Sequence, residues 1–153
     1  MHHNFQDCRI PQIVFVFTTT MLNKSLIALA FGGLAIGMTE FTMMGILPDI
    51  ANDLKIDIPT AGHLIALYAL GVVVGAPVLV LFTGKYPPKN VLLFLMLLFV
   101  AFNGLFAIAP EYNTLLISRF MSGLPHGAFF GVGSVVAAQL AGKGKEAQAI
   151  SIM

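Results

Sequence analysis

The stretch VLLFLMLLFVAFNGLFAIA, residues 91–109, contains no charged side chain and ends at Pro110. A helix needs about 20 apolar residues to cross the ~30 Å hydrocarbon core of a bilayer, so this stretch predicts a membrane span. Comparable apolar stretches lie at about residues 25–47, 62–82 and 115–140. We expect Pro48 to end the first of these spans, because proline removes a hydrogen bond from a helix.

The composition of the chain indicates the same class of protein. Of its 153 residues, 58% are apolar and 10% are charged, whereas soluble domains carry about 25% charged residues. A net charge of +1 gives no basic surface of the kind that binds nucleic acid. The single cysteine, Cys8, excludes an intramolecular disulfide, and no Cys/His spacing is typical of a metal site. We therefore expect the lipid bilayer as a partner, without nucleic acid, metal or cofactor.

The two ends of the chain differ from the four spans. Ala149 to Met153 turns apolar again after the polar segment AGKGKEAQ, which predicts the start of a fifth span. Near the N-terminus, residues 10–17 are apolar but too few to cross a bilayer, and Met21 is a natural start for a membrane protein. We therefore divide the chain into an N-terminal extension, residues 1–20, and a partial transmembrane domain, residues 21–153.

The charges of the loops predict the orientation, because cytoplasmic loops collect lysine and arginine. The segment before the first span and the loops after the second and fourth spans are basic, with Arg9, Lys24, Lys85, Lys89, Lys143 and Lys145. The loops after the first and third spans are acidic, with Asp49, Asp53, Asp57 and Glu111. We therefore predict a multi-pass protein whose N-terminus is cytoplasmic.

Ionisable side chains inside a bilayer are costly and mark candidate functional sites. The predicted spans contain Glu40 in the first span and Arg119 and His126 in the fourth. Glu40 and Arg119 lie at similar depths, roughly 10 Å and 6 Å from the same surface, so they can pair if the two spans are neighbours. Two interpretations stay open for this pair: a proton-coupling site, or an ion pair that only fixes helix packing. For His126 a proton relay and a neutral, hydrogen-bonded side chain are both compatible with the sequence.

Glycines at intervals of four predict close contacts between helices, since small residues let two backbones approach. The predicted packing positions are Gly33 and Gly37 in the first span, Gly71 and Gly75 in the second, and Gly123, Gly127 and Gly131 in the fourth.

The chain shows no sign of an enzyme. It has no nucleotide-binding glycine loop, no metalloprotease motif and no nucleophile–base pair at recognisable spacing. Ser118, Ser122 and Ser134 lie near His126 in the sequence, but serines in membrane helices usually bond to their own backbone.

Two segments resemble a known family, the major facilitator superfamily. TEFTMMGILPDIANDL, residues 39–54, resembles the first helix and outer loop of these transporters. RFMSGLPHGAFFGVGSVVAAQLAGKGKEAQAIS, residues 119–151, resembles their fourth helix and the cytoplasmic loop that follows it. The resemblance covers about residues 21–153 and is closest to the drug- and sugar-efflux antiporter branch, similar to arabinose efflux permeases.

The resemblance implies a proton-coupled exporter of small molecules in the bacterial inner membrane, with first and fourth helices that line a central cavity. Arg119 matches an arginine that the family associates with proton coupling, and Gly123 matches the glycine of the same motif. Glu40 takes the place of an acidic residue common in the first helix of this branch. The loop LFTGKYPPKNVLL keeps the basic residues Lys85 and Lys89 but has Gly84 at the position of the family's aspartate.

Family members have twelve helices in two halves, so the resemblance implies an N-terminal fragment whose partner is the missing C-terminal half. Two alternatives remain open from the sequence alone. One is a complete four-helix transporter like the small multidrug resistance proteins, and the other is a membrane scaffold that transports nothing.

Overall fold

The computed structural model describes residues 24–153, and the regular structure within them is entirely helical. Four long helices, α2 (Lys24–Leu54), α3 (Ile58–Thr83), α4 (Pro88–Ile108) and α5 (Tyr112–Leu140), are followed by the short helix α6 (Glu146–Ser151). Each long helix is long and apolar enough to cross a membrane. The predicted fold class is therefore confirmed, with α6 at the place of the predicted fifth span. The extension predicted at residues 1–20 lies outside the described residues.

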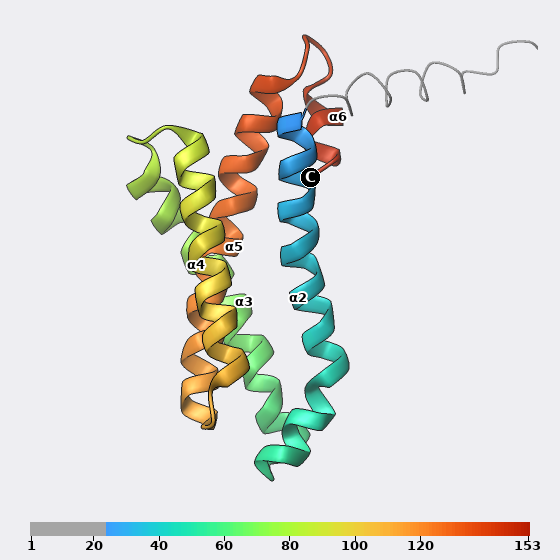
Figure 1. Ribbon diagram of the computed structural model, residues 1–153, viewed down its shortest axis with the longest axis vertical. Coiled ribbons are helices and arrows are strands. Elements are labelled where there is room, and N and C mark those ends of the chain that lie inside the picture. Colours follow the sequence, from blue (N-terminus) through green and yellow to red (C-terminus); the bar gives the residue numbers. More distant parts are fainter. Residues whose placement is uncertain (1–23) are drawn as a thin grey trace, which may run out of the picture.

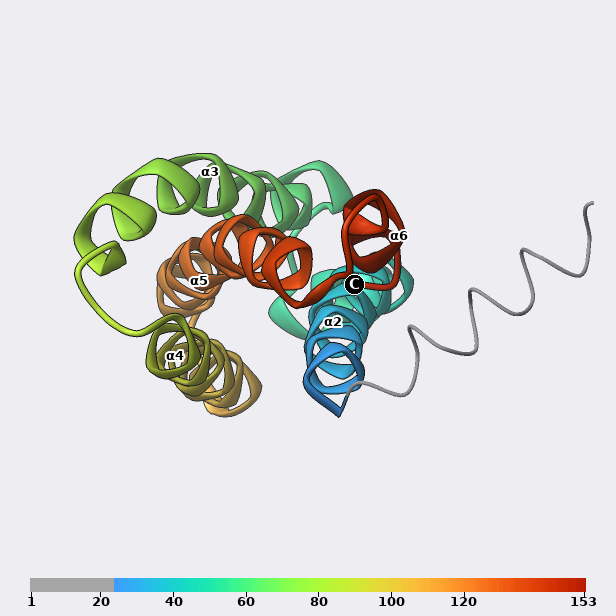
Figure 2. The same ribbon diagram turned by 90° about the horizontal axis from the view of Figure 1, so that it is seen from above.

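The four long helices run alternately in opposite directions, so their connections alternate between two ends of the bundle (Figure 1). One end holds Lys24, the α3–α4 turn and the α5–α6 loop, and the other holds the α2–α3 and α4–α5 connections. Seen along the bundle, α5 lies in the middle and packs against α3, α4 and α6 (Figure 2). α2 packs less extensively against α3 and α5.

Prolines explain several helix ends. Pro59 lies in the first turn of α3, and α4 begins at Pro88 directly after Pro87. The first turn of a helix tolerates proline because its N–H groups have no partner within the helix. Pro110 follows α4 and forces the preceding residue, Ala109, into an extended conformation. These prolines therefore fix where α3 and α4 begin and where α4 ends.

The prediction that Pro48 ends the first span is wrong, since α2 continues through Pro48 to Leu54. Proline removes one backbone hydrogen bond, but the turn after it packs against its neighbours. Ala51 is buried, and Ile50 and Leu54 pack against a core cluster formed with residues of α3 and α5. Burial of these side chains offsets the missing hydrogen bond, at roughly 25 cal/mol per Å² of apolar surface.

The surface between the two ends is apolar on every long helix. Large side chains such as Phe31, Phe41, Leu81, Leu97 and Ile117 are mostly exposed. Extended apolar surfaces of this kind are typical of proteins that face lipid rather than water. The chain is therefore a multi-pass membrane protein.

Candidate functional site

Four glycines bring the backbones of α3 and α5 together. A Cβ atom placed on Gly71 would lie 3.1 Å from the Cα atom of Gly123 and would collide with a carbonyl oxygen of α5. A Cβ atom on Gly123 would collide with the carbonyl oxygen of Tyr68, and one on Gly75 or Gly127 would collide with a carbonyl oxygen of the facing helix. Only residues without a side chain permit this approach.

Arg119 lies buried beside this contact, with 2% of its surface exposed. Its guanidinium carbon lies 4.1 Å from the centroid of the Tyr68 ring and 5.5 Å from that of Phe106 in α4. Among the described residues, the Nε atom of Arg119 has no hydrogen-bond partner. The cation is therefore held by aromatic faces, an arrangement worth about 2 kcal/mol when it is desolvated.

Tyr68 also contacts His126, which lies on the same face of α5 as Arg119. The Tyr68 hydroxyl and the Nδ1 atom of His126 are 2.8 Å apart and share a hydrogen bond. The His126 ring also packs against the Phe130 ring, with centroids 5.2 Å apart. The structure thus brings Arg119 and His126 together through a single tyrosine of α3.

Glu40 lies on α2, outside this group of direct contacts. Its side chain is partly buried, and no ion pair within 4.0 Å joins it to Arg119 in the described part of the chain. It lies within electrostatic range of Arg119 and His126. The contact face of Arg119 points toward α3 and α4, so the direct Glu40–Arg119 pair that the depths allow is not formed.

The other predicted packing glycines have different surroundings. Gly33 lies against the backbone of Met153, whereas nothing lies within 4 Å of a Cβ atom placed on Gly37. A Cβ atom on Gly131 would meet the Val80 side chain at an ordinary 3.5 Å. Gly37 and Gly131 therefore make no close backbone contact with another helix of the described residues, and Gly33 makes its contact with the C-terminal Met153 rather than with a neighbouring long helix.

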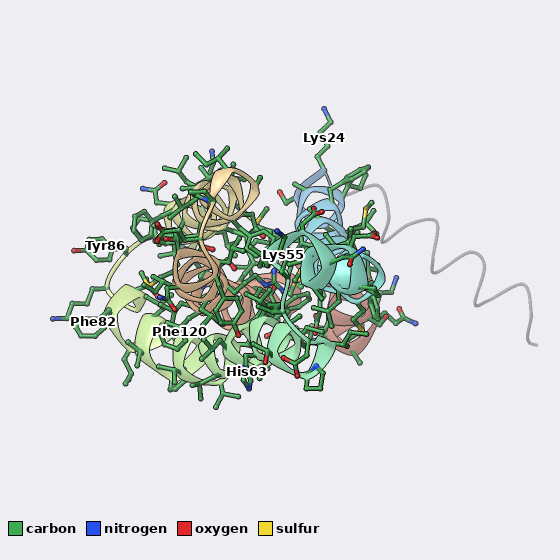
Figure 3. The ribbon with its side chains drawn as sticks, turned by 90° about the horizontal axis from the view of Figure 1, so that it is seen from below. Lys24, Lys55, His63, Phe82, Tyr86 and Phe120 are labelled. Atoms are coloured by element: carbon green, nitrogen blue, oxygen red, sulfur yellow. The ribbon has the colours of Figure 1, made fainter. Side chains whose placement is uncertain are left out.

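Lys85 and Lys89 are exposed at the turn between α3 and α4. Figure 3 shows their neighbours Phe82 and Tyr86 pointing away from the bundle at this turn. The basic residues of this loop lie at the end of the bundle that also carries Lys24. They take no part in the contacts of Arg119 with Tyr68 and Phe106.

The serines near His126 do not form a nucleophilic site in the structure. Ser118, Ser122 and Ser134 each donate a hydrogen bond to the carbonyl oxygen of the residue three positions earlier in α5. Their hydroxyl groups are therefore occupied within the helix, as expected for serines in membrane helices.

Sequence reasoning missed Tyr68, the residue at the centre of this site. Tyrosines of membrane proteins concentrate at the two interfaces, as Tyr112 does, whose hydroxyl donates to the Thr60 carbonyl at 2.7 Å. Tyr68 lies 11 positions into α3, counting Ile58 as the first, or roughly 15 Å from its start. A tyrosine in the middle of a predicted span is unusual, and this position could have identified Tyr68 as a candidate site residue.

Comparison with known proteins gives a consistent result. The family model described as Major Facilitator Superfamily matches residues 29–153. The inner membrane transport protein YdhP of Escherichia coli strain K12 is 50% identical over 132 residues, which are 86% of this chain and 34% of that protein. The chloramphenicol resistance protein of Streptomyces lividans is 32% identical over 125 residues, 82% of this chain and 32% of that protein.

A third relative is described as "Probable sugar efflux transporter" of Mannheimia succiniciproducens, and it is 30% identical over 142 residues, 87% of this chain and 36% of that protein. The chain thus spans about a third of the length of these relatives. Two of the three descriptions name transport, the third names drug resistance, and none names an enzyme. The solved structures contain no significant match.

Proposed function

The chain belongs to the major facilitator superfamily, and on this premise we propose that residues 21–153 form the N-terminal membrane region of a proton-coupled exporter. The C-terminal half of the transporter is then the partner that completes the transport pathway. The family match, which covers most of the chain, speaks against the alternative of a small multidrug resistance protein.

The proposed membrane is the bacterial inner membrane, with the N-terminus in the cytoplasm. The distribution of charge along the bundle supports this orientation. Lys24, Lys85, Lys89 and Lys143 belong to one end of the bundle, and Asp49, Asp53, Asp57 and Glu111 belong to the other (Figure 1). Because lysine and arginine collect on the cytoplasmic side, the Lys24 end faces the cytoplasm.

The observation that carries the coupling proposal is the buried cation of Arg119 without a carboxylate beside it. A purely structural ion pair gains its stability from direct contact, and a buried charge without that contact costs several kcal/mol. Proteins retain such unfavourable groups mainly where function requires them. The separation of Glu40 from Arg119 therefore favours the coupling interpretation over the packing interpretation.

In the proposed mechanism Glu40 binds and releases the proton, and Arg119 is a fixed cation whose attraction on Glu40 depends on the charge of that carboxyl group. The deprotonated carboxylate of Glu40 is attracted toward the Arg119 cation, and the protonated carboxyl is not. Because α2 packs less extensively against α5 than α3 and α4 do, this difference in attraction can shift the relative populations of two positions of α2. Proton binding on one side and release on the other then drive the exchange with substrate.

We propose drugs or sugars as the exported small molecules. The descriptions of two relatives, a chloramphenicol resistance protein and a sugar efflux transporter, support these two substrate classes. A largely apolar lining with few polar groups suits lipophilic drugs, whereas the sugar class rests on the description of the relative alone.

The test is efflux of radiolabelled chloramphenicol and arabinose from energised cells that express the complete gene product. We expect export of at least one compound, and we expect a protonophore to abolish it. Glu40→Gln should abolish this export with normal expression, and Glu40→Asp should retain part of it. Glu111→Gln, which neutralises an exposed carboxylate at the membrane surface, is the matched control. Export unchanged in Glu40→Gln contradicts the role of Glu40, and export of neither compound contradicts the proposed substrate classes.

A further inference from the structure

Tyr68 touches both ionisable residues of α5 that the proposed function uses. Arg119 and His126 are separated by seven positions, or about 10 Å along the helix, and Tyr68 contacts both of them. The tyrosine itself belongs to α3 and is 2% exposed. A single side chain from a neighbouring helix therefore links the two residues.

The close contact of α3 and α5 explains how one tyrosine reaches both groups. Gly123 lies between Arg119 and His126 on the same face of α5, and the Tyr68 carbonyl oxygen lies directly over it. A side chain at position 123 would push the Tyr68 backbone outward. With glycine there, the tyrosine ring lies beside the guanidinium, and its hydroxyl reaches the imidazole.

The ring and the hydroxyl of Tyr68 perform different tasks. The ring face lies 4.1 Å from the Arg119 guanidinium carbon and stabilises a cation that lacks a partner at Nε within the described residues. The hydroxyl lies 2.8 Å from His126 Nδ1, and a hydrogen bond at one ring nitrogen determines the orientation and tautomer of an imidazole.

From this geometry we propose that Tyr68 is a positioning residue of the coupling site, holding Arg119 with its ring face and orienting His126 with its hydroxyl. The proposal deepens the proposed function and rests on it for the role in transport. Tyr68 itself neither gains nor loses a proton in the cycle. It keeps the cation at a constant position while the charge of Glu40 changes.

Two variants separate the ring from the hydroxyl. Tyr68→Phe keeps the ring over Arg119 and removes the hydroxyl, whereas Tyr68→Leu removes both. In the complete gene product with ¹⁵N-labelled histidine in lipid, we expect Tyr68→Phe to shift the His126 ring-nitrogen resonances, assigned by their loss in His126→Asn. The matched control is Tyr112→Phe, because the Tyr112 hydroxyl lies 3.2 Å from His63 Nδ1. It should shift the His63 resonances and leave those of His126 unchanged.

The contact with Arg119 is tested by a double-mutant cycle on thermal stability. Tyr68→Leu should destabilise the wild-type protein and have a clearly smaller effect in an Arg119→Met background, because two residues in contact are not additive. In transport, Tyr68→Phe should change the pH profile of export, and Tyr68→Leu should lower its rate by roughly tenfold or more, as expected for loss of a desolvated cation–π contact.

Unchanged His126 resonances in Tyr68→Phe overturn the hydroxyl role, and an additive cycle overturns the ring role. If Tyr68→Leu does not fold, Tyr68→Phe still tests the role of the hydroxyl. Tyr68→Met, which also removes the ring, then takes the place of Tyr68→Leu in the double-mutant cycle. The resonances and the cycle do not depend on transport. Unchanged export in Glu40→Gln therefore contradicts the proposed function and leaves the His126 resonances and the double-mutant cycle unaffected. Unchanged resonances together with an additive cycle refute the role of Tyr68 alone.

Discussion

The guanidinium of Arg119 lies against the face of the Tyr68 ring, 4.1 Å from its centroid, and not against a carboxylate. In the described part of the chain, no side chain or backbone group forms a hydrogen bond with its Nε atom. An arginine in this position contributes less to stability than its burial costs, because desolvation of a charge is repaid fully only by a close partner of opposite charge. Stability and function are therefore expected to respond differently when Arg119 is replaced.

Arg119→Met should abolish proton-coupled export without lowering the stability of the protein. Methionine fills a similar volume with a flexible apolar side chain and removes an unsatisfied group, which costs about 1–3 kcal/mol when buried. We expect a melting temperature in detergent equal to or above that of the wild type. Lys143→Met removes an exposed cation and should change neither quantity. A substantial drop in melting temperature for Arg119→Met would assign Arg119 to helix packing.

Gly123→Ala should destabilise the bundle, although alanine favours a helix over glycine by about 1 kcal/mol. The added Cβ atom collides with the Tyr68 carbonyl oxygen, and overpacking of this kind costs about 1–3 kcal/mol. Gly104→Ala in α4 is the matched control, since no atom lies within 4 Å of its Cβ position. Thermal unfolding followed by circular dichroism should show a loss for the first variant and a small gain for the second. Equal melting temperatures would mean that α3 can move aside freely.

The orientation can be tested with single cysteines, because the chain has only one native cysteine, Cys8. In the complete gene product with its native cysteines replaced by serine, Asp53→Cys should react in intact cells with a thiol reagent that does not cross membranes. Lys143→Cys should react only after the membrane is permeabilised. Both residues are exposed and belong to opposite ends of the bundle. The reverse pattern of labelling would place the N-terminus outside the cell.

Tyr112→Phe should lower the free energy of unfolding by at least about 1 kcal/mol, the typical contribution of one hydrogen bond, because it also removes the exposed contact with His63 Nδ1. The Tyr112 hydroxyl donates to the Thr60 carbonyl oxygen at 2.7 Å and thereby joins the start of α5 to that of α3. Tyr86→Phe is the control, because the Tyr86 side chain is exposed and points away from the bundle (Figure 3). Chemical denaturation of the two variants compares them directly, and an equal loss would show that the Thr60 contact does not contribute.

Some features of the fold could be predicted because they depend on short stretches of sequence. The absence of charge in residues 91–109 is sufficient to predict α4, since a bilayer core excludes unpaired polar groups over this length. The end of α2 could not be predicted in this way. Pro48 weakens the helix locally, but Ile50 and Leu54 pack against a cluster that includes Leu64 of α3 and Leu115 of α5, which are distant in the chain.

The candidate site also combines features that local sequence predicts with contacts that it does not predict. Glu40, Arg119 and His126 stand out in the sequence because each places an ionisable group where charge is costly. Tyr68 carries no charge and did not stand out, and the direct contact considered between Glu40 and Arg119 is absent from the described residues. Depth along a span follows from counting residues, but the partner of a side chain does not.

The sequence by itself determined the number and approximate positions of the long apolar helices, the family, and the ionisable residues within those helices. Each of these depends on composition over a single span or on a local motif. Only the tertiary structure decided that Arg119 faces Tyr68 and Phe106 and that four glycines join α3 to α5. The rotation and tilt of a membrane helix are set by packing against its neighbours, and hydropathy carries no information about them.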